Sequence, residues 1–193
     1  YTNTSRYSTV FYFETNHYAW IDNCEMYNSL GTPNGGRPYG GNSPYSAYTT
    51  GGVVRNLDSF LPVGLTRDVY VENISSDIFR GGRLAVNITI NNLGVGYLET
   101  GAHPDFFQVY NPGYVIENTI FYNIRVYNMI AQGIFGEGND AKDLAFVNLL
   151  LQKVPESPMI SQIPGWDHML LWHVTTVDSG MLFRQYPSIN IDF

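Results

Sequence analysis

The sequence of 193 residues contains a single cysteine, Cys24, and charged side chains make up only 14% of it. One cysteine cannot form a disulfide within the chain, and its place in an apolar run is typical of a buried, unreactive thiol. No apolar run approaches the roughly 20 residues that cross a bilayer as a helix. The sequence therefore leaves the redox compartment open and predicts no transmembrane segment.

Several functional motifs are also missing. No histidine and cysteine spacing is typical of a zinc site, and no glycine-rich loop is typical of a phosphate site. Acidic residues outnumber basic ones by 17 to 10, which gives a formal net charge of −7. This balance argues against nucleic acid as a partner. It would also repel a polyanion unless a metal or arginine offset the field locally, so a neutral glycan fits the charge better.

Aromatic and turn-forming residues are abundant. The chain has 15% aromatic residues, 19 glycines and 10 prolines, a composition that suits a turn-rich all-β protein and disfavours both disorder and a helical bundle. The length is sufficient for one sizeable core and gives little reason to expect two. We therefore expect a single domain over residues 1–193.

The most informative pattern is a repeat with a spacing of 25 residues. When the chain is cut at multiples of 25, five short apolar and aromatic runs fall into register. Each run contains a polar residue at the same place, and these residues are Asn23, Asn73, Asn123, Asn148 and His173. Runs this short indicate strands, and a fixed period of 20–50 residues is typical of stacked repeats. Without recurring helices, the pattern predicts an all-β parallel β-helix, a solenoid with rungs of about 25 residues.

In such a solenoid equivalent strands stack about 4.8 Å apart. We expect the recurring asparagines to point inward at a turn and to form a ladder, with His173 capping or interrupting it. In particular, Asn123 should lie directly beneath Asn148. The interval between Asn73 and Asn123 would hold two coils, or one coil with an insertion near residues 93–102.

Residues 31–52 consist mainly of Gly, Pro, Asn, Ser and Tyr. This composition predicts a loop insertion without a regular strand. Its tyrosines Tyr39, Tyr45 and Tyr48 would either stack on a ligand or cover the flank of the coil. The chain starts at Tyr1 and ends at Phe193 in a strand-like run, so we expect a piece of a longer protein or ends that a partner covers.

Residues 103–108 read His-Pro-Asp-Phe-Phe-Gln, and strand-like runs follow at 115–123, 132–136 and 167–175. On these motifs the chain resembles the right-handed parallel β-helix superfamily of the pectate-lyase type. More narrowly, it is similar to bacterial secreted β-helix repeat proteins with a His-Pro-Asp-x-x-Gln strand start, from about Asp68 onward. The resemblance implies a right-handed solenoid, an extracellular or cell-surface location and a polysaccharide partner. The superfamily includes lyases, hydrolases, epimerases and phage tailspikes, so it does not fix an activity.

The leading catalytic candidates are His103, Asp105 and Gln108. At the start of a strand they could place imidazole, carboxylate and amide along one edge of a groove, which suits proton abstraction or sugar binding. Alternatively, they bond only to turn amides. A lyase would also need Ca²⁺ or a basic side chain to stabilise an enolate-like charge. The cation candidates are Arg80, Arg83, Arg125 and Arg184.

The family motifs are incomplete. The arginine and calcium-binding aspartates of pectate lyases are not recognisable, and the Asp-Asp doublet of polygalacturonase-type hydrolases is absent. Separated carboxylates remain available for hydrolysis, namely Asp77, Asp105, Glu137, Asp140, Glu156 and Asp167. We expect Arg80, Gln108 and Arg184 to share a face. We expect substrate contacts from Arg80, Tyr110, Trp166, Asp167, His168 and Arg184, with Trp166 as an indole that stacks on a sugar.

Two functional hypotheses follow. The first is an extracellular β-helix that binds a polysaccharide along its side and that acts, if it is an enzyme, as a lyase, epimerase or hydrolase. The second is a structural or adhesive element such as a virion spike, an adhesin or part of a surface layer, in which exposed tyrosines mediate assembly. Homo-oligomerisation remains open under both.

Overall fold

The computed structural model describes residues 2–3, 9–13, 19–28, 37–41, 47–57, 59–60, 64–94, 104–109, 115–136, 141–154, 161–163, 166–183 and 191–192. Every regular element in these ranges is a strand. The strands are β1 (Thr2–Asn3), β2 (Thr9–Phe13), β3 (Ala19–Asp22), β4 (Glu25–Asn28), β5 (Arg37–Gly41), β6 (Ala47–Thr50), β7 (Val53–Leu57), β8 (Leu65–Arg67), β9 (Tyr70–Ile74), β10 (Leu84–Leu93), β11 (Asp105–Val109), β12 (Ile116–Met129), β13 (Gln132–Gly136), β14 (Ala141–Lys153), β15 (Ser161–Ile163), β16 (Asp167–Val177), β17 (Met181–Phe183) and β18 (Ile191–Asp192). The described ranges contain no helix of the length and apolarity that a membrane span requires.

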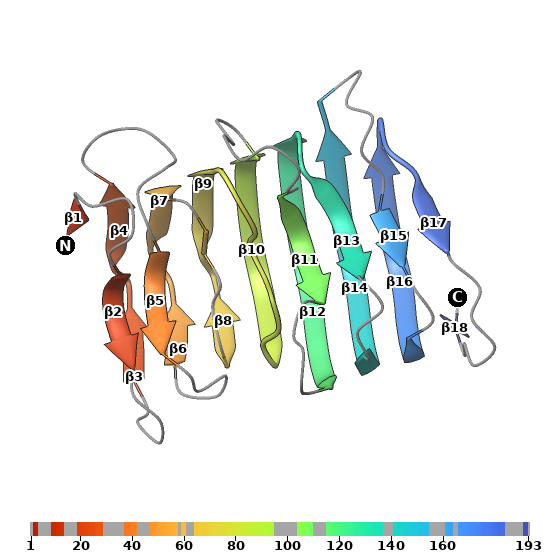
Figure 1. Cartoon of the computed structure of the whole chain (residues 1–193), viewed down its shortest axis with the longest axis horizontal. Coiled ribbons are helices and arrows are strands. Elements are labelled where there is room, and N and C mark those ends of the chain that lie inside the picture. The colour runs from red at the N-terminus through yellow and green to blue at the C-terminus, as the bar shows by residue number, and fades with distance from the viewer. Residues whose placement is uncertain are drawn as a thin grey trace.

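The strands form three sheets, one of twelve strands, one of four (β11, β13, β15 and β17) and one of two (β2 and β5). Neighbouring strands pair in parallel, as β12 does with β10 and with β14. The large sheet extends as a row from β1 at one end to β18 at the other, and the four-stranded sheet forms a second layer over β12, β14 and β16 (Figure 1). From β10 onward the chain passes alternately from one sheet to the other. The prediction of an all-β protein with parallel strands is confirmed.

The long strands share a repeating five-residue pattern. In β12 the buried residues Thr119, Phe121, Ile124 and Val126 are separated by two, three and two residues. The additional residue in the step of three is Asn123, whose φ of 56° lies in the left-handed region. A left-handed residue turns the chain and shifts the alternation of side chains by one, and asparagine tolerates that conformation better than most residues. Each five-residue unit therefore has side chains that point inward, outward, inward and outward, and it ends in the left-handed corner residue.

The corner residues form a ladder of side-chain hydrogen bonds. Asn148 donates to Asn123 (2.9 Å), Asn123 to Asn87 (2.7 Å), and Asn87 to the carboxylate of Asp68 (2.9 Å). The prediction that Asn123 lies beneath Asn148 is confirmed. The predicted inward orientation is wrong, because Asn87 and Asn148 are exposed. A left-handed corner bends the backbone around the core and leaves its own side chain on the outside.

The predicted membership of that ladder is wrong for Asn73. Asn73 donates to Asn56 (3.0 Å) and accepts from Asn92 (2.9 Å), so it belongs to a second ladder at the next corner. The steps along the first ladder are 19, 36 and 25 residues. Because these steps are unequal, cutting the chain at multiples of 25 places Asn73 in register with Asn123 by coincidence. The step from Asn87 to Asn123 includes residues 95–103, which lie outside the described residues.

Two strands lie inside the segment 31–52, so the prediction that it contains no regular strand is wrong. β5 pairs with β2, and β6 lies between β3 and β8. Pro38 is part of β5, whose described partner is on one side only, and an edge position tolerates a residue without an amide proton. Of the three tyrosines noted above, Tyr48 is exposed, while the side chains of Tyr39 and Tyr45 lie outside the described residues.

Aromatic side chains join the four-stranded sheet to the large sheet. Phe107 of β11 lies with its ring centre 5.0 Å from Phe121, 5.7 Å from Phe146 and 6.0 Å from Trp166. Phe121 and Phe146 stack with ring planes 3° apart. These rings are fully buried and continue an aliphatic core along the row of strands. Cys24 is half-buried rather than fully buried, and its thiol donates to the carbonyl of Asp22.

Candidate functional site

Two of the three predicted catalytic residues are enclosed. Asp105 is fully buried and Gln108 is 6% exposed, because every side chain of β11 is covered. The backbone N–H of Asp105 donates to Oδ1 of Asp77 (2.9 Å). Neither side chain lines an open groove, contrary to the sequence prediction. His103 and Tyr110 lie outside the described residues.

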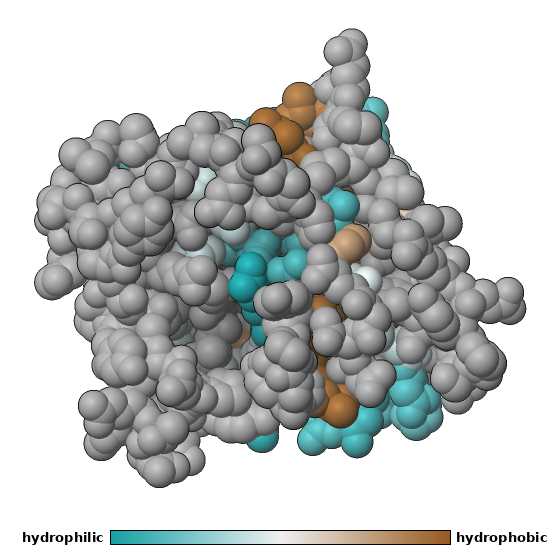
Figure 2. Space-filling model, viewed as in Figure 1, coloured by the Kyte–Doolittle hydropathy of each residue, from teal (hydrophilic) through white to brown (hydrophobic). Residues whose placement is uncertain are grey.

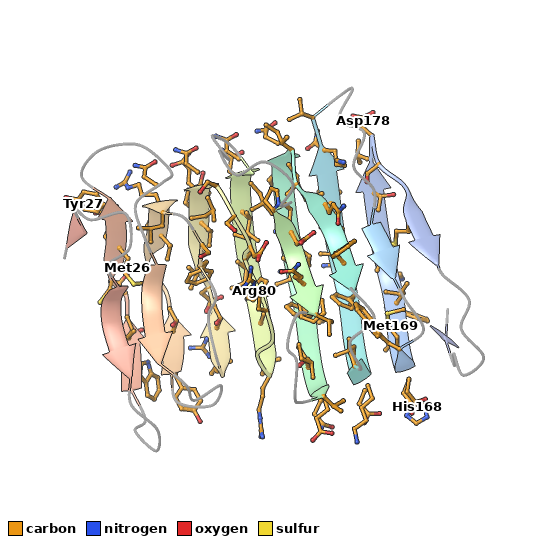
Figure 3. The ribbon with its side chains drawn as sticks, viewed as in Figure 1. Met26, Tyr27, Arg80, His168, Met169 and Asp178 are labelled. Atoms are coloured by element: carbon orange, nitrogen blue, oxygen red, sulfur yellow. The ribbon has the colours of Figure 1, made fainter. Side chains whose placement is uncertain are left out.

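Arg80 forms an ion pair with a buried carboxylate. Its Nε and Nη2 atoms each lie 2.6 Å from Oδ2 of Asp77, a side chain that is 1% exposed. Arg80 lies near the centre of the face shown in Figure 3, and the described surface there is hydrophilic in Figure 2. The guanidinium charge of Arg80 therefore compensates the charge of Asp77. The carboxylate of Asp77 in turn joins the turn after β9 to the start of β11, because it accepts from the backbone N–H of Asp105.

The predicted shared face of Arg80, Gln108 and Arg184 is found only in part. Phe79 bridges Phe107, which places Arg80 beside Gln108 in the register. From Gln108 that register continues through Phe135 and Gln162 to Leu182. Arg184 comes two residues later in the chain and lies outside the described residues.

The predicted surface cluster of Trp166, Asp167 and His168 is divided. Trp166 is 1% exposed and packs on Phe107, so its indole offers no face to a sugar, contrary to the prediction. Asp167 and His168 are exposed, and His168 lies at the lower end of β16 in Figure 3. Its Nδ1 lies 3.1 Å from Oδ1 of Asp143.

The remaining candidates form no metal site within the described ranges. No group of three or more His, Cys, Asp or Glu side chains that could hold a metal occurs in the described ranges. A hollow of about 180 Å³ lies beside Gly81, Gly82 and Thr119 and opens to solvent. It is smaller than the roughly 300–1,000 Å³ of common ligand pockets. The described surface therefore directs attention to the outside of the large sheet.

One outer face of the large sheet carries two columns of side chains over seven successive levels, a level being one turn of the chain in the stack. Each level has one left-handed corner residue in line with the first ladder, and these residues are Asn23, Gly51, Asp68, Asn87, Asn123, Asn148 and His173. The column positions lie three residues and one residue before that corner. The first column is Trp20, Tyr48, Leu65, Leu84, Ile120, Ala145 and Leu170; the second is Asp22, Thr50, Arg67, Val86, Tyr122, Val147 and Trp172. Thr50 in the second column is buried. Successive levels are separated by about 4.8 Å.

The first three levels of this face combine aromatic and polar side chains, and we call them the aromatic–polar site (Trp20, Asp22, Tyr48, Thr50 and Arg67). The indole of Trp20 is 72% exposed. Its N–H nevertheless donates to Oγ1 of Thr50 (2.9 Å), and that hydroxyl donates to Oδ1 of Asp22 (2.5 Å). The ring of Tyr48 lies 6.4 Å from the indole at 44°. An exposed indole is thus held in one orientation beside a carboxylate and a hydroxyl.

Arg67 completes the site and is balanced locally, because its Nε lies 3.1 Å from Oδ2 of Asp68. Trp20 and Asp22 were not among the predicted site residues, because their strand reads in the sequence only as part of the repeat. The signal was present, because counting three and one residues back from Asn23 reaches both.

No protein-family model, curated protein or solved structure matches this chain. The candidate site therefore rests on its geometry and chemistry alone.

Proposed function

We propose that this chain is a right-handed parallel β-helix, acting outside the cell or on its surface, that binds a polysaccharide at the aromatic–polar site. The passage of the chain between two parallel sheets and the 25-residue step from Asn123 to Asn148 support the solenoid. The handedness and the location follow from the resemblance to secreted β-helix proteins.

The exposed but fixed indole of Trp20 carries the binding proposal. Tryptophan is enriched at interaction surfaces, and the face of an exposed indole can cover the apolar face of a sugar ring. Asp22 is exposed and lies two residues after Trp20, where its carboxylate can accept hydrogen bonds from sugar hydroxyls. The buried hydroxyl of Thr50 holds both side chains in place. An indole already held by Thr50 loses little conformational entropy on binding.

The charge of the site favours a neutral glycan. Asp22 and Asp68 supply two carboxylates around the single guanidinium of Arg67. A chain of uronates would meet repulsion here as well as from the net charge of −7.

Affinity electrophoresis in gels containing neutral or uronate polysaccharides tests this proposal. We expect a neutral polysaccharide to retard the protein and Trp20→Ala to abolish the retardation. Tyr70→Ala is the matched control, because Tyr70 is an exposed aromatic residue on the adjoining outer face. Retention of binding by Trp20→Ala, or no binding to any glycan class, would show that the proposal is wrong.

Catalysis by His103, Asp105 and Gln108 is a second part of the sequence hypothesis, and the burial of Asp105 and Gln108 weakens it. It predicts turnover that His103→Ala abolishes without loss of the fold. Ultraviolet absorbance of unsaturated uronate products, with and without Ca²⁺, measures lyase activity directly.

A structural or adhesive role is the second candidate function. The observation that favours it is the apolar character of the levels from Leu84 to Trp172 on the same face, where Tyr122 and Trp172 are both about half exposed. Large exposed apolar patches are typical of protein contacts.

A further inference from the structure

The outer face changes its chemistry along the stack. Beyond the aromatic–polar site both columns continue without charged side chains, and Leu84 and Val86 lie directly beside Leu65 and Arg67. We call these levels the apolar strip; its members are Leu84, Val86, Ile120, Tyr122, Ala145, Val147, Leu170 and Trp172. The polar groups on these side chains are one phenol hydroxyl and one indole N–H. The strip is therefore an apolar continuation of the aromatic–polar site.

We propose that the whole face binds the surface of an insoluble, ordered polysaccharide, a neutral solid in which extended chains lie side by side. One surface chain of the solid runs along the two columns. The inference rests on the proposed function, because it assigns a physical form to the neutral glycan and extends the contact from the aromatic–polar site over all seven levels.

The spacing of two aromatic rings supports this substrate. Tyr122 and Trp172 belong to the second column and lie two levels apart, with Val147 between them. Their separation along the stack is about 9.6 Å. In an extended chain of β-linked sugars, a ring has a length similar to the strand spacing, and every second ring presents the same face. The two half-exposed rings therefore match equivalent apolar faces of alternate sugars.

The shape of the face suits a flat solid. The strands of the large sheet lie side by side in one row (Figure 1), and their register is unbroken at the column positions from β3 to β16. Large sheets twist unless side-chain ladders or stacking hold them flat. Here the corner ladder from Asp68 to Asn148 runs one residue beside the second column. Seven levels extend the face over about 29 Å.

The small number of polar groups on the strip favours a solid over a dissolved chain. The hydroxyls of a dissolved sugar are hydrated, and covering them with apolar side chains leaves hydrogen bonds unmade. In an ordered solid the hydroxyls of a surface chain bond to neighbouring chains, while the apolar faces of its rings remain in contact with water. Packing such faces against the strip removes apolar surface from water without that cost.

Depletion binding of the 193-residue chain to microcrystalline cellulose and to chitin, as two neutral solids, tests the inference. Binding of the corresponding short soluble oligosaccharides, measured by calorimetry, reports on the aromatic–polar site alone. We expect Trp172→Ala and Tyr122→Ala each to weaken binding to the solid about tenfold, the loss expected for one large apolar contact. Val177→Ala is the matched control, because Val177 is an exposed apolar residue of the same strand beyond the corner at His173.

An exchange of positions tests the spacing. Trp172→Val with Val147→Trp keeps the composition of the strip and moves the indole to the level next to Tyr122. This double variant should bind the solid as weakly as Trp172→Val alone. Wild-type affinity in the double variant would show adsorption by hydrophobicity without regard to spacing, and it would overturn the inference. Thermal unfolding confirms that each variant is folded.

The outcomes separate this inference from the proposed function. If soluble oligosaccharides bind in a manner that Trp20→Ala abolishes, while Trp172→Ala and Tyr122→Ala bind the solids like the wild type, the inference is wrong and the proposed function stands. The same conclusion follows if the soluble glycans bind and neither solid does. If neither form of any neutral glycan binds, the proposed function is wrong and the inference is wrong with it.

Discussion

The side chain of Asn148 donates a 2.9 Å hydrogen bond to that of Asn123, and both residues hold left-handed φ angles of 54° and 56°. The ladder continues to Asn87 and ends on the carboxylate of Asp68. A chain of amides that terminates on an ion polarises along its length and strengthens each bond. Each corner shifts the alternation of buried and outward side chains by one, and so the corners of the large sheet decide which side chains form the outer face that carries the aromatic–polar site.

Replacing Asn123 tests the two contributions of a corner residue. Asn123→Gly keeps the left-handed conformation and removes two ladder bonds, which we expect to cost about 1–3 kcal/mol. Asn123→Ala also places a methyl-bearing residue at positive φ and should cost about 1–2 kcal/mol more. Urea unfolding measures both. Equal stability of the two variants would show that φ imposes no cost here.

The all-β class could be predicted from the sequence because strand-forming runs recur without helical segments, and Asn148 above Asn123 could be predicted because levels near the C-terminal end repeat every 25 residues. The partner of Asn73 could not be predicted, because the number of residues per level varies among the earlier levels and no local sequence pattern indicates that number. Trp166 was misassigned for a related reason. In the sequence, an indole next to Asp167 and His168 suggests a surface residue. Only the left-handed corner at His168 determines which of its neighbours face inward.

The candidate site was predicted poorly because burial depends on both sheets at once. The motif around Asp105 and Gln108 suggests a strand start that is open to solvent. In the fold that strand is buried, and the backbone of Asp105 is bonded to Asp77. Trp20, by contrast, is part of an ordinary apolar run. Its exposure follows only from its distance to the corner at Asn23.

Gly52 lies close to the backbone of Cys24 in the neighbouring level. A Cβ on Gly52 would lie 2.2 Å from the carbonyl oxygen of Cys24, whereas a Cβ on Gly51 would meet nothing nearer than 3.5 Å. Both glycines have positive φ. We expect Gly51→Ala to cost about 1–2 kcal/mol for its conformation alone and Gly52→Ala to cost about 1–3 kcal/mol more for the overlap.

Thermal or urea unfolding of the two glycine variants checks this order. The pair is internally controlled, because the residues are adjacent and the same methyl group is added. If Gly52→Ala proved no less stable than Gly51→Ala, the close approach of Gly52 to Cys24 would be refuted.

The two arginines Arg80 and Arg125 were both candidates for a catalytic cation, and their stability effects should differ. Arg80→Met leaves the buried carboxylate of Asp77 without its cation, and we expect a loss of about 2–3 kcal/mol, discounted because Arg80 is partly exposed. Arg125 is exposed on the large sheet, so Arg125→Met should change stability by less than about 0.5 kcal/mol. Chemical unfolding of both variants decides between them, and equal losses would contradict a structural role specific to Arg80.

Lys153 makes the fold sensitive to pH. Its side chain is 1% exposed, and burial lowers the pKa of its ammonium group from 10.5 to about 8. Below pH 8 the lysine is protonated in both the folded and the unfolded chain, and the folded state bears the full cost of the buried charge. Between pH 8 and 10.5 the folded chain loses the proton first, so this contribution to stability increases with pH.

Lys153→Met should therefore stabilise the protein at pH 7, by at most about 3 kcal/mol for a shift of this size. The advantage over wild type should shrink as the pH rises from 7 to 9.5, as urea unfolding at several pH values would measure. Lys142→Met is the opposing control, because the hydrogen bond with Glu117 raises the pKa of Lys142 and its stabilising contribution is lost only at high pH. A Lys153→Met variant that is less stable than wild type at pH 7, or whose advantage is the same at pH 7 and 9.5, would mean that the ammonium group of Lys153 is satisfied inside the fold.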